Sequence, residues 1–359
     1  MLGPIVPSHG PTNAKILVLA EAPGEQESEK GKPLIGPSGY ALRSMLNTIG
    51  VNLDDCWKSN VFSRRPPNNS LAAGYGTDVP SPRSRALGAL GRNPTWWLAD
   101  EHFGELDRLA QEIEAVNPNI IVALGNTACW ALGLTGGISD IRGYVYQTQA
   151  VGDHHLSRAF KVLPTYHPAM ILRQWSHRTI SISDLEKARV EAADPTFTPD
   201  SAELWLSPSL EDMETFRARF LTGATHVATD VETKKGQITC VSFAPNPSIS
   251  LCVPFWVEGP QPHYWASELE ELRAWKWCAE VLEDPATVKV LQNGLYDVQY
   301  FYKHGIRPQN CTADTMLQHH SLYSELQKGL GFLGSVYCNV PSWKKMRTVK
   351  REELLKKDD

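Results

Sequence analysis

Two stretches decide the architecture of the second half of the chain: residues 226–232, HVATDVE, and residues 293–297, NGLYD. In the first, Asp230 and Glu232 are two residues apart and would share one face of a strand. Carboxylates on one face repel each other unless a cation lies between them, and hard ions such as Mg²⁺ or Mn²⁺ prefer oxygen ligands. Asp297, at the start of a predicted helix, would supply a third carboxylate.

These motifs, in this order, resemble the first two motifs of the 3′–5′ proofreading exonuclease domain of family A DNA polymerases. The resemblance covers about residues 205–359, and the segments 314–317, DTML, and 330–333, LGFL, fit the same family. It implies a ribonuclease-H-like domain with a mixed sheet. The alternative for an isolated Asp-x-Glu is a pair of solvated carboxylates that bind no metal.

The resemblance also implies roles for individual residues. Asp230 and Glu232 would bind the first of two Mg²⁺ or Mn²⁺ ions, with Asp230 bridging both and Asp297 holding the second. Two such ions stabilise the attacking and leaving oxygens of phosphodiester hydrolysis. Asn293 would orient the DNA strand or Asp297.

A third family motif, Tyr-x-x-x-Asp, is expected after residues 341–343 but does not occur before Asp359. We therefore expect the front of a longer polymerase, truncated before that motif, with impaired exonuclease activity. The implied partner is a C-terminal polymerase domain of the same polypeptide. The charged tail 344–359 is predicted to be helical.

Composition indicates a two-domain protein without membrane spans. A chain of 359 residues exceeds the usual size of one core. Seven cysteines without a Cys-x-x-Cys favour a reducing compartment and oppose a thiolate metal site. The longest apolar runs, Ile16–Ala20 and Ile120–Leu124, are too short to span a bilayer. We expect a cytoplasmic protein, in the host cytoplasm if the gene is viral.

Charge indicates local rather than general binding of a polyanion. The net charge is −5, which excludes a bulk polyanion binder, but residues 58–92 form a basic stretch rich in Pro, Gly, Asn and Ser. Such a loop can hold a nucleic-acid backbone. The alternative is a solvated loop without a ligand.

Hydrophobic periodicity predicts α/β architecture in both halves. Alternating strands and helices in the first half favour an α/β/α sandwich with a parallel central sheet, with strands at 15–21, 57–62, 119–124 and 160–164 and helices at 39–50 and 101–116. In the second half we expect strands at 226–230, 238–243 and 250–255 and helices at 266–283 and 294–304. The predicted boundaries are 1–193, a linker at 194–208 and 209–359.

The strand ends of the first half carry five ordered motifs that together are similar to those of family 4 uracil-DNA glycosylases. They span about residues 12–190 and read AEAPGE at 20–25, GKPLIGPSG at 31–39, NVFSRRPP at 60–67, LGNTA at 124–128 and TYHPA at 165–169. The resemblance implies a domain that extrudes a nucleotide from the stack into a pocket.

Specific roles follow from that resemblance. His167 would stabilise the departing uracil anion, Asn60 would read the edge of the base, and Glu21 would position or activate water beside the sugar. Pro23 and Gly24 would let the backbone approach a phosphate. Site residues of this kind belong at the carboxyl ends of strands in open α/β sheets.

The sequence also departs from that family. Its members usually carry an iron–sulfur cluster on four cysteines, but Arg64 occupies one cysteine position, and Cys56 and Cys129 cannot hold a cluster alone, so we expect no cluster. Leu34 stands where the family has an aromatic residue that stacks on uracil. A long insertion, about residues 68–98, enters where the family is compact.

Two interpretations of the first domain remain: a working glycosylase, or a DNA-binding module without turnover that contacts DNA through Arg64, Arg65 and the basic loop. We favour the second, because a polymerase that excised uracil from its template would leave a non-coding gap. The whole chain is expected to be the N-terminal part of a replicative family A polymerase of a bacteriophage. The alternatives are a free-standing repair protein and a non-enzymatic DNA-holding module.

Overall fold

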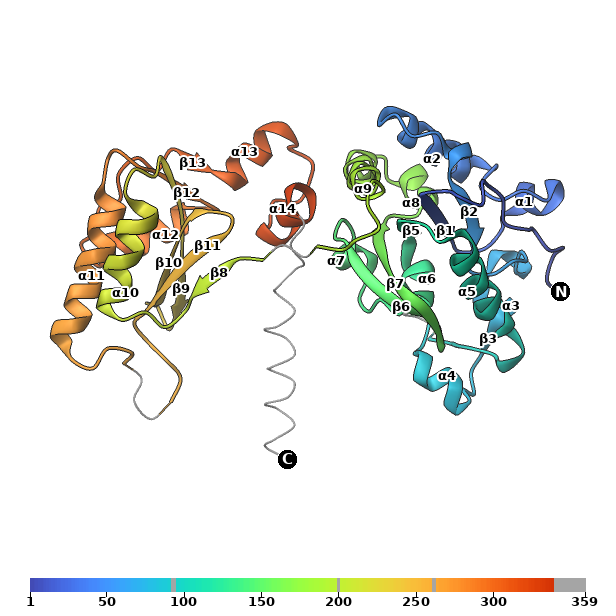
Figure 1. Ribbon diagram of the computed structural model, residues 1–359, viewed down its shortest axis with the longest axis horizontal. Helices are drawn as coiled ribbons and strands as arrows, with labels where there is room; N and C mark the ends of the chain where they lie inside the picture. Colours follow the sequence, from blue (N-terminus) through green and yellow to red (C-terminus); the bar gives the residue numbers. More distant parts are fainter. Residues whose placement is uncertain (92–94, 199–200, 260–262, 339–359) are drawn as a thin grey trace. The chain divides into compact units, whose positions relative to one another are not determined.

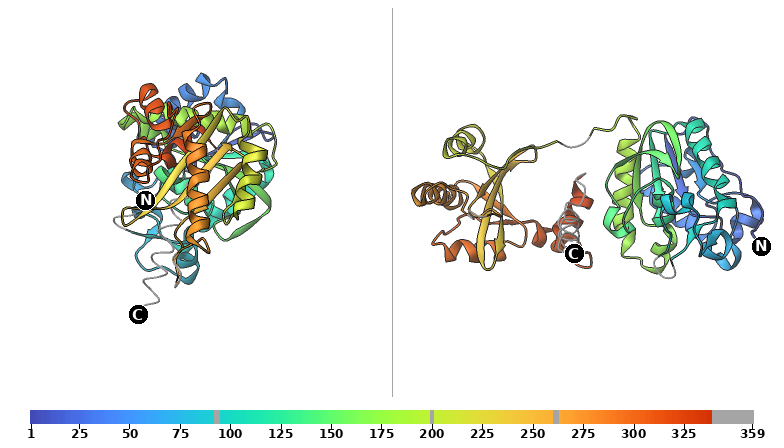
Figure 2. Two further views of the ribbon diagram at one scale, coloured as in Figure 1. Left: turned by 90° about the vertical axis from the view of Figure 1, so that its left-hand side faces the viewer. Right: turned by 90° about the horizontal axis from the view of Figure 1, so that it is seen from below.

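The computed structural model describes residues 1–91, 95–198, 201–259 and 263–338, so the tail segments 341–343 and 344–359 lie outside the described residues. The chain forms two compact units (Figures 1 and 2). Unit 1 comprises Met1–Thr198 together with the segment that begins at Gly331, and unit 2 comprises Pro199–Leu330.

Unit 1 is built on a five-stranded sheet in the order β2-β1-β5-β7-β6. The bounds are β1 Ile16–Ala20, β2 Trp57–Asn60, β5 Ile120–Leu124, β6 Tyr146–Val151 and β7 His154–Thr165. The first four strands in this order are parallel, and β6 is antiparallel to β7. Strands β1 and β5 are buried along their whole length, as expected for central strands of a parallel sheet covered on both faces.

Helices cover both faces of this sheet (Figure 1). Helices α2 (Pro37–Thr48), α8 (Pro168–Arg173) and α9 (His177–Glu191) share one core with alternate residues of β1 and β5. Helices α5 (Gly104–Val116) and α6 (Gly125–Ala131) complete the sandwich. The predicted α/β sandwich with a parallel central sheet is confirmed.

The stretch 63–95, which has no periodicity, contains short elements where it is described. They are α3 (Leu71–Tyr75), β3 (Gly76–Thr77) and α4 (Pro82–Leu87), and β3 pairs with β4 (Trp97–Leu98). Two further short helices are α1 (Glu25–Lys30) and α7 (Ile138–Ile141).

Unit 2 contains a six-stranded mixed sheet in the order β13-β12-β9-β10-β11-β8. The bounds are β8 Glu203–Trp205, β9 His226–Lys234, β10 Gln237–Asn246, β11 Ile249–Pro254, β12 Val288–Leu291 and β13 Ala313–Asp314. Strands β9, β10 and β11 form the antiparallel meander that the sequence predicts, and β8 arises within the segment expected to be a linker. The mixed sheet of the second domain is confirmed.

One face of this sheet is covered and the other carries the carboxylates. Helices α10 (Leu210–Phe216), α11 (Glu268–Glu283) and α12 (Leu295–Lys303) share a core with Val227 and Val231 of β9. Ala228, Asp230 and Glu232 alternate with the buried positions of β9 and are exposed, because successive strand side chains point to opposite faces. Helix α13 (Thr315–Leu322) follows β13. In the described part of the chain, no helix combines the length and apolarity required to cross a membrane.

Helix α14 (Leu330–Tyr337) packs against a buried ion pair of unit 1. Arg142 donates two hydrogen bonds to Asp184, one of them 2.9 Å long from Nε, and a third of 2.8 Å to the hydroxyl oxygen of Ser335. The hydroxyl of Tyr144 donates to the carbonyl of Gly331 at 2.7 Å. Arg142 and Asp184 are almost completely buried, so each charge depends on the other.

Replacing Arg142 by Met should therefore leave the buried Asp184 carboxylate without its cationic partner and lower the free energy of unfolding of unit 1 by about 3–5 kcal/mol. Denaturant unfolding of the full chain, followed by hydrogen exchange of unit 1 peptides, would measure the loss. Arg189→Met is the control, because Arg189 pairs with Glu186 in solvent and its loss should leave the unfolding curve unchanged. Equal curves for the two variants would contradict this account.

Candidate base-binding pocket and carboxylate site

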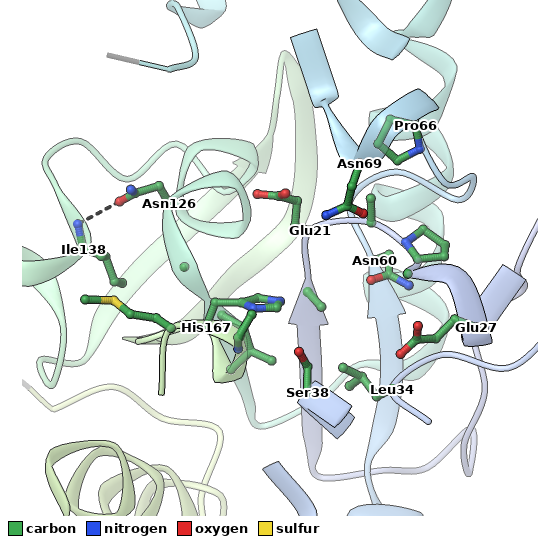
Figure 3. A pocket seen from close by; sticks show the side chains of 18 of the residues that line it. Glu21, Glu27, Leu34, Ser38, Asn60, Pro66, Asn69, Asn126, Ile138 and His167 are labelled. Carbon is green, nitrogen blue, oxygen red and sulfur yellow. Dashed lines mark hydrogen bonds between the residues drawn. The ribbon is translucent and has the colours of Figure 1, made fainter. Parts of the chain in front are cut away.

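A cavity of about 370 Å³ opens at the carboxyl ends of β1, β2 and β5, next to the start of α8 (Figure 3). This is the edge at which open α/β sheets carry their sites. Glu21 follows β1, Asn60 ends β2 and His167 precedes α8, and all three line the cavity. The other predicted lining residues, Pro23, Gly24 and Leu34, also line it.

His167 presents a defined tautomer to this pocket. Its Nδ1 accepts a hydrogen bond of 3.2 Å from the backbone N–H of Ala169 and thereby caps α8. Nδ1 therefore carries no proton, and in the neutral ring the proton resides on Nε2. Burial lowers the pKa of His167. The pocket thus contains a neutral imidazole with an Nε2–H donor.

Glu21 is oriented by the neighbouring helix. The hydroxyl of Thr127, on α6, donates a hydrogen bond of 2.5 Å to its carboxylate. In Figure 3, Glu21 lies between His167 on one side and Asn60 on the other. The three predicted side chains therefore line one and the same cavity.

The loop that carries Leu34 is fixed by close backbone approaches. Leu34 has a φ of 54°, and a Cβ at position 39 would lie 1.9 Å from its carbonyl oxygen, so only glycine fits there. Glu27, which is nearly buried, accepts a hydrogen bond of 3.0 Å from the N–H of Gly36 and lines the pocket. Leu34 therefore lines the pocket with its backbone held in one conformation.

Sequence reasoning missed several lining residues. Glu27 lies in an acidic run on α1 whose sequence resembles that of an exposed helix face. In the sequence, only the nearby Gly24 and Gly36 indicate that Glu27 belongs to the pocket wall. The remaining unpredicted residues with polar side chains are Ser38, Asn69, Asn126 and Arg173.

The two arginines predicted to contact DNA are engaged within the protein. Arg64 donates to the carbonyl of Gly3 at 3.0 Å, and Arg65 forms a 3.2 Å ion pair with Glu25. Neither is among the residues that line the pocket. Their role in DNA binding stays a prediction.

The residues present do not fit a four-cysteine iron–sulfur cluster. Cys56 and Cys129 are buried free thiols, and burial raises the pKa of each to about 12, which disfavours the thiolate. Beside Arg64, Tyr75 of the insertion donates to the Arg64 carbonyl at 2.7 Å and stacks on Phe62. Residues 1–91, 95–198, 201–259 and 263–338 gather no group of three metal-ligating side chains.

In unit 2, the structure brings the predicted carboxylates into one neighbourhood. Asp297 accepts a hydrogen bond of 3.0 Å from the N–H of Val231, between Asp230 and Glu232. Burial, reinforced by the charge of Asp230, raises the pKa of Asp297 to about 6. Partial desolvation and the charge of Glu232 raise the pKa of Asp230. In both groups the shift disfavours the charged form of the carboxylate.

Asp314 positions the second exonuclease-like motif, a role that the sequence did not reveal. Its carboxylate accepts hydrogen bonds from the N–H groups of Asn293 and Gly294 at 3.2 and 2.8 Å. It also caps α13 through Met316. Asn293 has a φ of 60°, and these bonds hold that turn ahead of Asp297.

The lowered pKa of His167 predicts how stability depends on pH. Below the usual histidine value of 6.5 the unfolded chain takes up a proton that the folded domain resists, so stability falls as the pH falls through this range. His167→Asn should reduce the loss of melting temperature between pH 7 and pH 5. Thermal unfolding in EDTA would measure it, and His155→Asn, at an exposed site, is the control. Parallel pH profiles for wild type and His167→Asn would contradict the lowered pKa of His167.

Comparison with known proteins identifies both units. The family model described as uracil DNA glycosylase superfamily matches residues 7–191, just over half of the chain, and the 3′–5′ exonuclease model matches residues 210–357. The type-4 uracil-DNA glycosylase of Thermotoga maritima is 32% identical over 52% of this chain and 81% of its own length. That of Archaeoglobus fulgidus is 33% identical over 51% of this chain and 79% of its own length.

Two further similarities are more limited. A DNA polymerase of Bacillus phage SP01 is 26% identical over 49% of this chain but only 16% of its own length. A crystal structure of the EXD2 exonuclease domain covers 39% of this chain and 71% of its own, with 14% identity and a TM-score of 0.26. On the strength of the family model and the type-4 relatives, the chain belongs to the uracil DNA glycosylase superfamily and carries a 3′–5′ exonuclease domain after the glycosylase-related one.

Proposed function

We propose that unit 1 binds single-stranded or locally melted DNA and receives an extruded uracil in its pocket. The observation that carries this proposal is the convergence of Glu21, Asn60 and His167 on one cavity. The Asn60 side chain offers both a donor and an acceptor, which complements the Watson–Crick edge of uracil. The neutral His167 adds a donor for a base carbonyl.

Excision of the uracil is the second candidate activity, and the state of His167 favours it. As the glycosidic bond breaks, negative charge develops on the uracil and positive charge on the sugar. A fixed Nε2–H donor in a buried site stabilises such an anion. Glu21 would position a water molecule beside the sugar. Against excision, Leu34 supplies no aromatic platform, and base stacking contributes about 1–3 kcal/mol.

Incubation of the full chain with a uracil-containing oligonucleotide in EDTA, followed by alkaline cleavage, separates these activities. EDTA chelates the divalent ions that the proposed exonuclease site of unit 2 requires, so strand breaks at uracil report glycosylase activity alone. If unit 1 only binds, we expect no breaks but a uracil preference that His167→Ala lowers roughly tenfold, the equivalent of one lost hydrogen bond to the base. Breaks that disappear in His167→Ala would instead establish excision.

For unit 2, we propose metal-dependent removal of 3′-terminal nucleotides, with Asp230, Glu232 and Asp297 holding Mg²⁺ or Mn²⁺. The chemistry of these side chains suits a hard cation, because all three offer carboxylate oxygens, and the N–H of Val231 holds Asp297 beside the strand that carries Asp230 and Glu232. No three side chains of the described residues already lie close enough together to hold a metal ion, so binding of an ion has to draw these carboxylates together. When bound, such ions activate the attacking water and stabilise the leaving oxygen. The chain itself orients Asp297 through the N–H of Val231 and fixes Asn293 through Asp314.

Asp230→Asn should reduce Mn²⁺-dependent degradation of a 3′-labelled primer by more than about 100-fold. The change preserves the shape of the side chain but removes its charge. Glu211→Gln, on the exposed first turn of α10, should leave the rate unchanged. Degradation that survives Asp230→Asn would remove the carboxylate site from the mechanism.

We infer that both domains serve a replicative DNA polymerase. Unit 1 would handle the template strand, and unit 2 would carry out proofreading. The similarity to a phage DNA polymerase over about half of this chain supports this role. The rival, a repair protein that acts without a polymerase, would show full nuclease and uracil-directed activities without any stable complex with a polymerase domain.

A further inference from the structure

A charged row on helix α5 faces the end of the strand that carries Asn60. Glu105, Arg108 and Glu112 are spaced three and four residues apart and therefore lie on one side of the helix. All three contact the segment 59–63, which ends β2 and leads into the following turn. None of them lines the pocket, so their effect on it must pass through that segment.

Strand β2 is at an edge of the sheet, and on its outer side the N-terminal segment bonds to it and to the residues that follow it only at separate points, such as His9 with Lys58 and Val6 with Ser63. Its other side is tied to β1: the N–H groups of Val61 and Phe62 donate to the carbonyls of Ala20 and Glu21 at 2.9 and 3.0 Å. Carbonyl groups at such an edge need partners from elsewhere.

Arg108 supplies these partners. One guanidinium nitrogen donates to the carbonyls of Asn60 and Val61 at 2.7 and 3.0 Å. Its Nε donates to Glu105 at 3.1 Å, and its remaining nitrogen pairs with Glu112. The guanidinium is thus held by two carboxylates while it binds the backbone carbonyls of Asn60 and of the residue that follows it.

The two glutamates also bind the segment directly. Glu105 accepts hydrogen bonds from the N–H and hydroxyl of Ser63 at 2.9 and 2.7 Å. Glu112 accepts from the hydroxyl of Ser59 at 2.6 Å and from that of Ser8 at 2.7 Å. Residues on both sides of Asn60 are therefore fixed to the same helix.

We propose that Arg108, held by Glu105 and Glu112, is a positioning residue that sets the orientation of Asn60 toward a bound base. The proposal rests on the proposed function of the pocket. An arginine is required because only its planar fork reaches two carbonyls and two carboxylates together. Loss of the fork frees the peptide that carries Asn60, and with it the direction of the amide that selects the base.

The test compares Arg108→Met and Arg108→Lys with Arg158→Met in the full chain. Arg158 is a matched control, because it donates to Asn117 and to the carbonyl of Pro118 at the other end of the same helix. Hydrogen exchange of the peptide spanning residues 59–63 is measured in the free protein. Binding is measured in EDTA with two single-stranded oligonucleotides that differ only by uracil or cytosine at one position, because the two bases present different Watson–Crick edges to the Asn60 amide.

For Arg108→Met we expect faster exchange in 59–63 and a roughly tenfold lower preference for uracil over cytosine, with cytosine binding unchanged. Arg108→Lys should restore part of the preference, and Arg158→Met should keep all of it. Unchanged exchange, or faster exchange with an unchanged uracil preference, would overturn the positioning role. A wild-type chain with no uracil preference would refute the proposed function itself, and the positioning role with it.

Discussion

The parallel pairing of β1 with β2 on one side and β5 on the other is the constraint on which the pocket depends. Parallel strands end at the same edge, so residues that follow them in distant parts of the sequence meet there. Glu21 and Asn60 come from adjacent strands and are joined by the backbone bonds of Val61 and Phe62 to β1. His167 arrives from β7, on the far side of β5.

This constraint explains how much of the site the sequence could predict. Glu21, Asn60 and His167 follow apolar runs that are recognisable as strands, and the edge of the sheet then places them together. Glu27 and Arg108 could not be predicted, because each lies on a helix where a charged residue is ordinarily solvated. Their roles come from tertiary contacts with residues 9 and 48 positions away.

The secondary structure likewise divides into elements that the sequence predicts and elements that depend on tertiary contacts. The buried runs of β1 and β5 and the amphipathic α5 are evident from periodicity, whereas α9 has a weak apolar stripe and β6 is a short edge strand. The contact of α14 with unit 1 depends on Arg142 and Asp184, 42 residues apart. A charged pair that far apart along the chain leaves no local pattern.

The two units differ in whether their buried or partly buried carboxylates have cationic partners within the protein. In unit 1, the carboxylate of Asp184 pairs with Arg142, and Glu105 and Glu112 share one cation, Arg108, so each of these carboxylates has a partner within the chain. In unit 2, burial and the charge of Glu232 raise the pKa of Asp230, and burial and the charge of Asp230 raise the pKa of Asp297. Internal compensation is typical of a framework, and its lack at a carboxylate cluster is typical of a site that is completed by an ion. The framework of the pocket is therefore built from the chain's own polar groups, whereas the carboxylates of unit 2 keep raised pKa values in the protein by itself.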